Sequence, residues 1–430
     1  MIDLNELPTP ARVRHGPDAT ELLRDPALIR ARCAAVSDAV SRGRSAHFKV
    51  DRSRLADLAA RVEQVARAAW PDLNVPAVGF WQALSAERVD RAGELGAALA
   101  GLNLVEQARS RIDVTVVGAL LGAGAGSRWR YSEAETEAGN GQALGGSEGL
   151  AVATYRAFRR GAFSAVPGEP MRVDASALRS LDATTLAALL QAGPANPMAG
   201  LEGRAALLQR LGEALQRRAT QHGTSARPAA VFDTLTDAGA RREVTATAVF
   251  ATLLDTFAAI WRTGSVLHGV ALGDVWPHRW AGGEDPMAGR HGTTAGWVPF
   301  HLPTQWLAHS LVEPFAHAGV AVTGLDALTA LPEARHGGLL IDGGVIVPRD
   351  AQALARTWAV SDEFVIEWRA LTVTLIDELA PLLRLQLGRD AQELPLAAVL
   401  ACTRATGHQL ARELRDGRSP ITIDSDGTVF

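Results

Sequence analysis

Cysteine and tyrosine are both scarce in this sequence, which contains two of each among its 430 residues. With only Cys33 and Cys402, the chain cannot build a disulfide framework or a zinc site made of cysteine ligands, and it fits a reducing compartment. Aromatic residues make up 5% of the chain, whereas Ala, Leu and Arg dominate. A β-sandwich would need more Val, Ile, Tyr and Phe, so the composition predicts a mainly α-helical protein.

The sequence also lacks an excess of positive charge and a long hydrophobic run. The formal net charge is −4 and the pI about 6.3, which argues against a dedicated nucleic-acid-binding protein. The longest apolar run, residues 114–126, is too short and too rich in glycine to span a bilayer. Residues 1–10 are acidic and lack an apolar core, so we expect no signal peptide. We therefore expect a cytoplasmic protein without a membrane partner.

The hydrophobic fraction, 47%, is enough for one large core or two fused cores. A polar stretch at residues 220–228 is the best candidate for a boundary between them. This boundary divides the chain into an N-terminal helical half, residues 1–220, and a C-terminal helical half, residues 221–430, which carries the candidate site. One continuous helical domain is the alternative, and the sequence does not decide between the two.

A glycine-rich stretch, GAGAG at Gly122–Gly126, follows an apolar segment at residues 112–121. That segment is either a helix or a buried strand, because its hydrophobicity is continuous rather than periodic. A glycine-rich loop after such a segment can cradle phosphate. The stretch matches neither the Rossmann fingerprint nor a Walker A loop, so we favour tight backbone packing, with a phosphate loop as the alternative.

The residue types that chemistry needs are concentrated between Trp297 and Glu378, in three short blocks. The first block, VPFHLPTQW at residues 298–306, leads into a helix. On that helix Gln305, His309 and Glu313 would share one face. His309 and Glu313 have the spacing of a metal-binding pair, but no HExxH motif is present.

The second block contains Glu333, Arg335 and His336. Pro332 ends a short predicted helix at residues 325–331, which would place these three side chains on a bend. Residues 339–347 contain a Gly-Gly pair between two apolar runs, and this pattern predicts a small β-hairpin. A rigid mount of this kind suits a catalytic acid or base, whereas a surface ion pair between Glu333 and Arg335 is the simpler interpretation.

The third block lies in a long amphipathic helix with an apolar stripe from Phe364 to Leu382. Glu367 falls on that stripe, so its carboxylate must be paired or have a raised pKa. A structural salt bridge to a buried arginine is the alternative to a catalytic role. Arg369 points to a different face of the helix. A final helix is predicted over residues 395–416, and the apolar chain end is expected to dock as a strand or an extended segment.

Several of these segments together resemble the uracil catabolism protein 4 family of fungi and bacteria, over essentially the whole chain. That family is associated with a pathway that opens uracil through a ribosylurea intermediate towards urea. The segments that carry the resemblance are GPANPMAGLEGR (193–204), LGDVW (272–276), VPFHLPTQWL (298–307), TGLDALTALPEARHGGLLID (323–342), EWRALTV (367–373) and SDGTVF (425–430), with SEGLAVAT (147–154) and Phe163-Ser164.

These segments are similar, more distantly, to the queuosine salvage glycosidases, which have a helical DNA-glycosylase-like fold. The resemblance therefore implies that fold here, to which the residue pattern at 339–347 adds a small β-hairpin element. The segments that would correspond to the glycosidase site are Phe300-His301-Leu302, Glu333-Ala334-Arg335 and Glu367-Trp368-Arg369-Ala370. The chain departs from the family pattern at Gly122, Leu302, Ala334 and His336, where the family usually has Asp, Lys, Tyr and Asn. A lysine in place of Leu302 would be a natural phosphate partner.

The resemblance implies an N-glycoside hydrolase that acts on a ribosylurea-like, nucleoside-derived compound, phosphorylated or not. Cleavage of such a bond builds positive charge on the sugar, which a carboxylate can stabilise. We assign Glu333 as the carboxylate that faces the sugar and Glu367 as a second acid or a buried support. No cofactor or metal is expected. The residues predicted to bind substrate are His301, Gln305, Trp306, Arg335, His336, Asp342 and Arg369.

Two alternatives stay open. The first is a metal-dependent amidohydrolase acting on a ureido compound, with a divalent ion held by His301, His309, His336 and Asp342. The second is a non-catalytic relative that binds a nucleoside-like ligand, or nucleic acid through a glycosylase-like fold. The acidic charge balance disfavours nucleic acid.

Overall fold

The computed structural model describes residues 19–133, 143–261, 265–267, 269–282 and 294–428. Residues 1–10, for which no signal peptide is expected, and the last two residues of the SDGTVF segment lie outside this range. Within it the fold is mainly α-helical with small two-stranded sheets, which confirms the fold class predicted from composition. No helix in the described part of the chain is both long and apolar enough to span a membrane.

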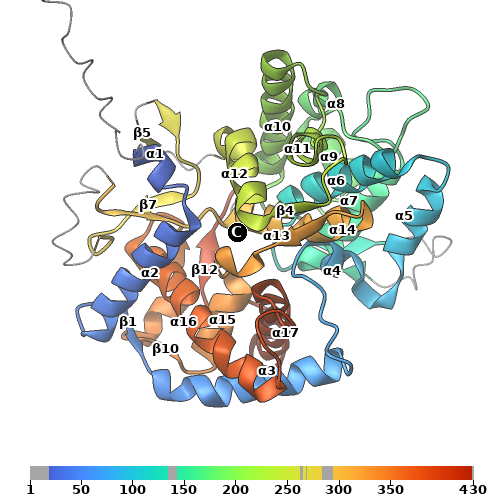
Figure 1. Ribbon diagram of the computed structural model, residues 1–430. Helices are drawn as coiled ribbons and strands as arrows, with labels where there is room; N and C mark the ends of the chain where they lie inside the picture. The colour runs from blue at the N-terminus through green and yellow to red at the C-terminus, as the bar shows by residue number, and fades with distance from the viewer. Residues whose placement is uncertain (1–18, 134–142, 262–264, 268, 283–293, 429–430) are drawn as a thin grey trace, which may run out of the picture.

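One group of helices combines the two ends of the chain (Figure 1). The long helix α16 packs against α2 and α3 from the N-terminal region, and α15 packs against α17. Their apolar side chains form one hydrophobic core. The helices of this group are α2 (Pro26–Ser41), α3 (Leu55–Ala69), α15 (Ala334–Asp342), α16 (Glu363–Leu387) and α17 (Leu396–Arg415).

The middle of the chain forms the other group of helices, which lies above the first in Figure 1 and has a second hydrophobic core. The apolar segment 112–121 is part of helix α6, so the question between helix and strand is settled as helix. The helices are α4 (Phe80–Leu84), α5 (Arg91–Leu99), α6 (Leu104–Leu121), α7 (Gly146–Arg159), α8 (Ala175–Ser180), α9 (Ala183–Leu189), α10 (Leu201–His222), α11 (Ala230–Thr236), α12 (Ala246–Phe257), α13 (Leu302–Ser310) and α14 (Val312–His317), with the short α1 (Ala19–Leu22) near the N-terminus.

The strands are short and pair mainly across long sequence distances. Several of these pairs tie distant parts of the chain together without forming a large sheet. The pairs are β1 (Phe48–Val50) with β10 (Ile346–Pro348), β2 (Tyr131–Ser132) with β3 (Ala143–Leu144), β4 (Glu243–Thr245) with β9 (Ala321–Thr323), β5 (Val266–Leu267) with β6 (Val270–Ala271), β7 (Val275–Pro277) with β8 (Trp297–Pro299), and β11 (Thr357–Ala359) with β12 (Thr422–Asp424).

The β-hairpin predicted at residues 339–347 is wrong. Leu339–Asp342 belong to helix α15, Gly343 ends that helix, and Gly344 turns the chain with a φ of +71°. Strand β10 pairs instead with β1, antiparallel, some three hundred residues earlier in the chain. The short helix predicted at residues 325–331 is also reduced to a 3₁₀ turn at Leu325–Ala327.

Other predictions for the C-terminal half are confirmed. Helix α16 follows the predicted stripe, and Glu367 is fully buried on it. Helix α17 covers the predicted range, and the chain end docks as strand β12, parallel to β11. The domain boundary at residues 220–228 stays a prediction.

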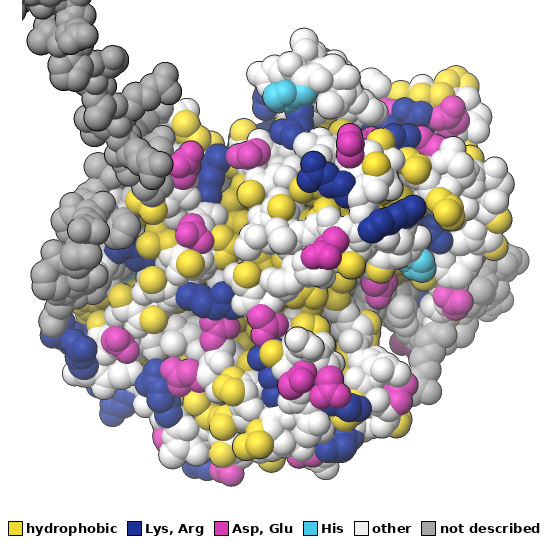
Figure 2. Space-filling model, in the orientation of Figure 1, with side chains coloured by type: hydrophobic (Ala, Val, Ile, Leu, Met, Phe, Trp, Pro, Cys, Tyr) yellow, Lys and Arg dark blue, Asp and Glu magenta, His cyan; other side chains and the backbone are white. Residues whose placement is uncertain are grey.

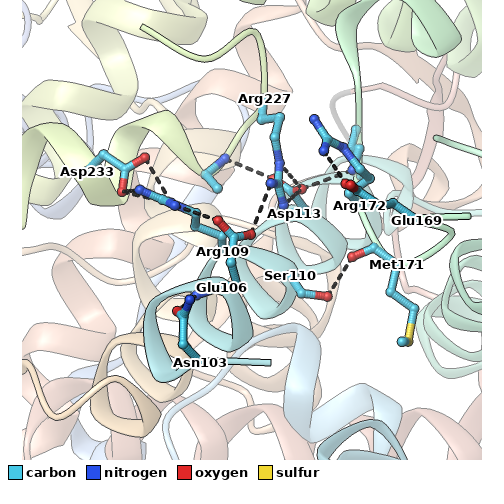
Figure 3. Close-up of polar contacts among 12 residues, drawn as sticks. Asn103, Glu106, Arg109, Ser110, Asp113, Glu169, Met171, Arg172, Arg227 and Asp233 are labelled. Carbon is cyan, nitrogen blue, oxygen red and sulfur yellow. Dashed lines mark hydrogen bonds and ion pairs between the residues drawn. The ribbon is translucent and has the colours of Figure 1, made fainter. Parts of the chain in front are cut away.

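A buried carboxylate fixes helix α6 in place (Figure 3). Asp113 is fully buried and accepts hydrogen bonds from the backbone N–H groups of Val173 and Ala229 and from Arg227. Burial raises the pKa of Asp113 to about 6 despite these donors. Because one carboxylate joins α6 to two separate loops, it also fixes where the C-terminal end of α6 lies, which matters for the pocket described below.

The contact between α15 and α17 depends on Gly407. A methyl group at this position would overlap the backbone carbonyl of Arg335, so the two helices can approach this closely only at a glycine. We expect Gly407→Ala to destabilise the protein by about 1–3 kcal/mol, because the overlap forces the helices apart. Gly101→Ala is the control, since its added methyl would meet open space. Equal urea midpoints for the two variants would contradict this packing account.

Candidate functional site

A pocket of about 220 Å³ lies where the two groups of helices meet. Trp306 forms part of its wall and packs against both hydrophobic cores. The described residues that line it are Ala119, Leu120, Gly122, Ala123, Gly124, Gly146, Ser147, Trp261, Leu302, Pro303, Trp306, Glu333, Ala334, Arg335, Arg404, Ser419 and Thr428. The pocket therefore combines aromatic walls with one carboxylate and two guanidinium groups, a lining suited to a small polar molecule.

Glu333 is the carboxylate of this pocket and also the N-cap of helix α15. Its Oε2 accepts the N–H of Arg335 at 2.9 Å, and its Oε1 accepts the N–H of His336 at 3.1 Å. Burial alone would raise the pKa of Glu333, but the His336 imidazole and the backbone donors outweigh it and lower the pKa to about 2. Glu333 is therefore ionised at any physiological pH, so it cannot serve as a proton donor.

His336 lies directly behind Glu333 and is fully buried. Its Nδ1 is 2.9 Å from Glu333 Oε1, and its Nε2 is 3.1 Å from the carbonyl oxygen of Leu400. The Nδ1 contact lacks hydrogen-bond geometry, so the ring is held in place by its bond to Leu400. The bend predicted for Glu333, Arg335 and His336 is thus the first turn of a helix, in which the imidazole of His336 lies against the carboxylate of Glu333.

Two arginines reach the pocket from different helices. Arg335, on α15, donates to the carbonyl oxygen of Gly417 at 2.9 Å. Arg404, on α17, donates to the hydroxyl of Ser147 at 2.8 Å and lies 5.3 Å from the ring centre of Trp306. Arg404 therefore links the two groups of helices across the pocket.

The glycine-rich loop forms another wall of the pocket through Gly122–Gly124. Its carbonyl groups turn away towards the buried Arg204, which donates to Leu121, to Ala123 at 2.7 Å and to Gly124 at 2.6 Å. Burial lowers the pKa of Arg204 to about 10. These bonds support the packing role of the loop, and the phosphate loop stays a prediction.

Arg369, predicted to bind substrate, lies elsewhere, in a buried pair with Asp274. Its two terminal nitrogens donate to the carboxylate at 2.9 and 2.6 Å, and its guanidinium lies 4.0 Å from the ring centre of Phe300. Asp274 also accepts the N–H of Leu302 at 2.9 Å. Burial would raise the pKa of Asp274, but Arg369 and the other donors lower it. This pair fixes the start of α13, which brings Leu302 and Trp306 to the pocket wall.

Three further predicted residues make contacts within the protein and do not line the pocket. His301 is buried with Nε2 2.8 Å from the carbonyl oxygen of Leu23. Gln305 is buried and accepts the N–H of Thr329 at 3.0 Å. Asp342 pairs with Arg415 at 2.5 Å. Of the predicted set, Glu333, Trp306 and Arg335 share the pocket.

Glu367, predicted as a second acid, does not reach the pocket of Glu333. Its Oε2 accepts a hydrogen bond from Ser45 at 2.6 Å, and its Oε1 lies 3.6 Å from His278 Nε2. The histidines proposed for a metal-dependent amidohydrolase do not gather either. Among the described residues, the side chains close enough together to hold an ion are His278, Glu363 and Glu367.

Sequence reasoning missed Ser147, Trp261, Arg404 and Thr428, which also line the pocket. Ser147 lies in a segment that carried the family resemblance, which was a usable signal. Arg404 had no such signal in the sequence, because an arginine on an amphipathic helix usually faces solvent. Asp274 also lies within a resembling segment, LGDVW, which was a usable signal.

The structure thus defines a mainly α-helical protein with a pocket between two groups of helices, and comparison with known proteins then defines its family. Residues 22–430 match the family described as "Protein of unknown function (DUF1688)". The chain belongs to this family. It is 34% identical to "Protein urg3" of Schizosaccharomyces pombe over 393 residues, which covers 89% of this chain and 92% of that protein. It is 34% identical to "Uracil catabolism protein 4" of Lachancea kluyveri over 419 residues, which covers 90% and 93% of the two chains.

Proposed function

We propose that this protein acts in uracil catabolism as an N-glycoside hydrolase, with a ribosylurea-like compound as its substrate. The pathway follows from the printed name of one relative, "Uracil catabolism protein 4". The single structural observation that supports the chemistry is the ionised carboxylate of Glu333 in the wall of a small pocket.

The reaction breaks the bond between the sugar C1 and a urea nitrogen. Water supplies a hydroxyl group to C1 and a proton to the nitrogen, so the products are urea and a free ribose species. Positive charge develops on the sugar ring as the bond breaks. The carboxylate of Glu333 is already charged and held by two backbone donors, so it can stabilise that charge without rearranging.

Glu333 is the only carboxylate among the described residues of the lining. With its pKa near 2 it has no proton to give the leaving group. The two-carboxylate arrangement of common glycosidases is therefore not part of this proposal. We propose a dissociative route, in which charge stabilisation by Glu333 contributes most and water protonates the urea nitrogen.

The charge of the lining favours an anionic substrate. Arg335 and Arg404 together exceed the single negative charge of Glu333, so the lining carries a net positive charge that attracts an anionic group. The N-terminal turn of α7 at Gly146 and Ser147 adds a partial positive charge, and no side chain caps it. A phosphate on the ribose would compensate this excess, and Arg404 would replace the cation missing at Leu302.

The aromatic wall provides a surface for the sugar or the ureido plane. Trp306 and Trp261 both line the pocket, and flat apolar rings are common partners of such groups. On the face of the molecule shown in Figure 2, acidic and basic side chains are interspersed rather than gathered in a basic stripe. This distribution favours a small-molecule substrate over nucleic acid on that face.

The test is to incubate the purified protein with ribosylurea and with its 5-phosphate and to measure released urea. We expect turnover of both, with a higher kcat/KM for the phosphorylated compound because it pairs with the two arginines. Uridine is the control for a sugar bonded to a nucleobase instead of urea, and uracil is the control without a sugar. Absence of urea release from both ribosylurea compounds, combined with a raised melting temperature in their presence, would replace the hydrolase proposal with the non-catalytic, ligand-binding alternative.

A further inference from the structure

A second cluster of chemically active side chains lies outside the Glu333 pocket. Glu363 and Glu367 are four residues apart at the start of α16, so they lie on one face of the helix. His278 follows strand β7, and its Nε2 is 3.8 Å from Glu363 Oε1 and 3.6 Å from Glu367 Oε1. One ligand atom from each residue lies within 4.8 Å of the others. These separations are too long for hydrogen bonds but match ligands arranged around one ion.

Two of these atoms are buried without a hydrogen-bond partner in the described part of the chain. They are His278 Nε2 and Glu367 Oε1, whose residues are 4% and 0% exposed. A buried carboxylate oxygen without a donor is costly, and so is a buried imidazole nitrogen. Both atoms point at the same space, so a single cation would satisfy them together.

The carboxylates are held in position by neighbouring groups. Ser45 donates to Glu367 Oε2 at 2.6 Å, while its own hydroxyl oxygen accepts the N–H groups of His47 and Phe48 at 2.9 Å each. This fixes one oxygen of Glu367 and leaves Oε1 directed at His278. The exposed Arg279 holds Glu363 through two hydrogen bonds of 2.6 and 2.7 Å. Supporting bonds of this kind are what orient the carboxylate ligands of metal sites.

The cluster is accessible from solvent. A cavity of about 350 Å³, lined by Pro277, His278, Arg279, Gly296, Ser361, Glu363 and Ile366, opens beside it. The cavity offers a route for an ion to enter and space for water to complete its coordination.

We propose that His278, Glu363 and Glu367 bind one divalent transition-metal ion, with Zn²⁺ as the best match. One imidazole nitrogen and two carboxylate oxygens suit a borderline ion better than Mg²⁺ or Ca²⁺, which prefer oxygen ligands alone. Three protein ligands leave a coordination position open to water from the adjoining cavity. The site joins the segment after β7 to the start of α16, and it goes beyond the proposed hydrolase function, which does not use it.

Ion binding requires a proton shift on His278. Its Nδ1 accepts the N–H of Trp280 at 3.3 Å, a long bond that places the ring proton on Nε2 in the metal-free protein. Binding at Nε2 displaces that proton, and the neutral ring then carries its proton on Nδ1, so the long Trp280 bond is lost.

The test is a Zn²⁺ titration of the chelator-stripped full-length protein against a chromophoric chelator. We expect one equivalent to bind with high affinity, and Glu363→Gln and His278→Gln each to weaken binding by about tenfold or more, because each removes one of three ligands. X-ray absorption of the loaded protein should show mixed nitrogen and oxygen ligation. Zn²⁺ should also raise the melting temperature of the wild type more than that of either variant.

His317→Gln is the matched control, because His317 is an exposed histidine on α14 away from the cluster. It should bind Zn²⁺ as the wild type does. Glu363 is half-buried at the start of α16, so we expect Glu363→Gln to fold. This variant therefore still tests the proposal if His278→Gln fails to fold. The proposal is overturned if the wild type binds no stoichiometric Zn²⁺, or if Glu363→Gln binds it as tightly as the wild type. Urea release assayed with and without Zn²⁺ keeps this result separate from the hydrolase proposal.

Discussion

Replacing Glu333 by glutamine should lower kcat/KM for the ribosylurea substrate by about 100-fold or more, or at least about 2.7 kcal/mol of transition-state stabilisation. The amide has nearly the same shape and can still accept a hydrogen bond at the start of α15, but it carries no negative charge. The cation that develops on the sugar would then face Arg335 and Arg404 without a compensating carboxylate. KM should change much less than kcat, because charge on the sugar appears only in the transition state.

The control is a helix-capping carboxylate outside the pocket. Asp90 caps α5 by accepting the N–H of Gly93 at 2.8 Å, so Asp90→Asn makes the same kind of change without touching the lining. It should keep full urea release. Melting temperatures of both variants show whether they are folded under the assay conditions. If folded Glu333→Gln turned over at the wild-type rate, the assignment of Glu333 would be wrong, even if the protein proved to be a hydrolase.

Replacing Arg369 by leucine should destabilise the protein by about 3–5 kcal/mol, because it leaves the buried carboxylate of Asp274 without its guanidinium partner. Both side chains are almost completely inaccessible to solvent, at 0% and 1% exposed. Urea denaturation at neutral pH measures the loss. Adding Asp274→Asn to the leucine variant should recover part of it, because the uncompensated charge is then gone.

Arg52→Ala is the matched control for an exposed pair. Arg52 contacts Glu378 at 2.8 and 2.9 Å, but their side chains are 38% and 33% exposed. Solvent screening limits such a pair to about 1 kcal/mol or less. If Arg369→Leu cost no more than Arg52→Ala, the buried pair would not be what fixes the start of α13.

The parts of the fold that could be predicted are those with a long local signal. Helix α16 has an apolar stripe over many turns, so the presence of a long helix and the burial of Glu367 followed from periodicity alone. The docking of the chain end was also predictable, because apolar residues rarely stay exposed at a terminus.

The hairpin prediction is wrong because the sequence pattern involves only neighbouring residues, whereas the true partner of strand β10 is distant in the chain. Two apolar runs around Gly343-Gly344 satisfy the hairpin pattern, yet the first run completes helix α15. Strand β10 finds its partner in β1, and nothing in the sequence near Ile346 points to Phe48–Val50. Pairing across such a distance depends on how α2, α3 and α16 pack, which a sequence window does not contain.

The candidate site was predicted only in part, because the partners of several predicted residues also come from distant segments of the chain. Glu333, Arg335 and Trp306 are close to one another in the fold and carried visible motifs. Arg369 and Glu367 are as buried as a site residue would be, but their partners Asp274, Ser45 and His278 come from distant segments. A polar residue inside an apolar pattern shows that a partner must exist, and it does not show whether that partner is a substrate, an ion or another side chain.

Glu333 is both the N-cap of α15 and the proposed catalytic carboxylate, and this has a consequence for interpreting the sequences of distant relatives. Serine, threonine, aspartate and asparagine are the usual choices at the start of a helix, and glutamate is not among them. If Glu333 acts as proposed, a relative that does not carry out the reaction could have one of these shorter residues at the N-cap of α15 and still cap the helix. On that proposal, we expect a glutamate at the N-cap in relatives that share the reaction, and a serine or an aspartate in relatives that share only the architecture.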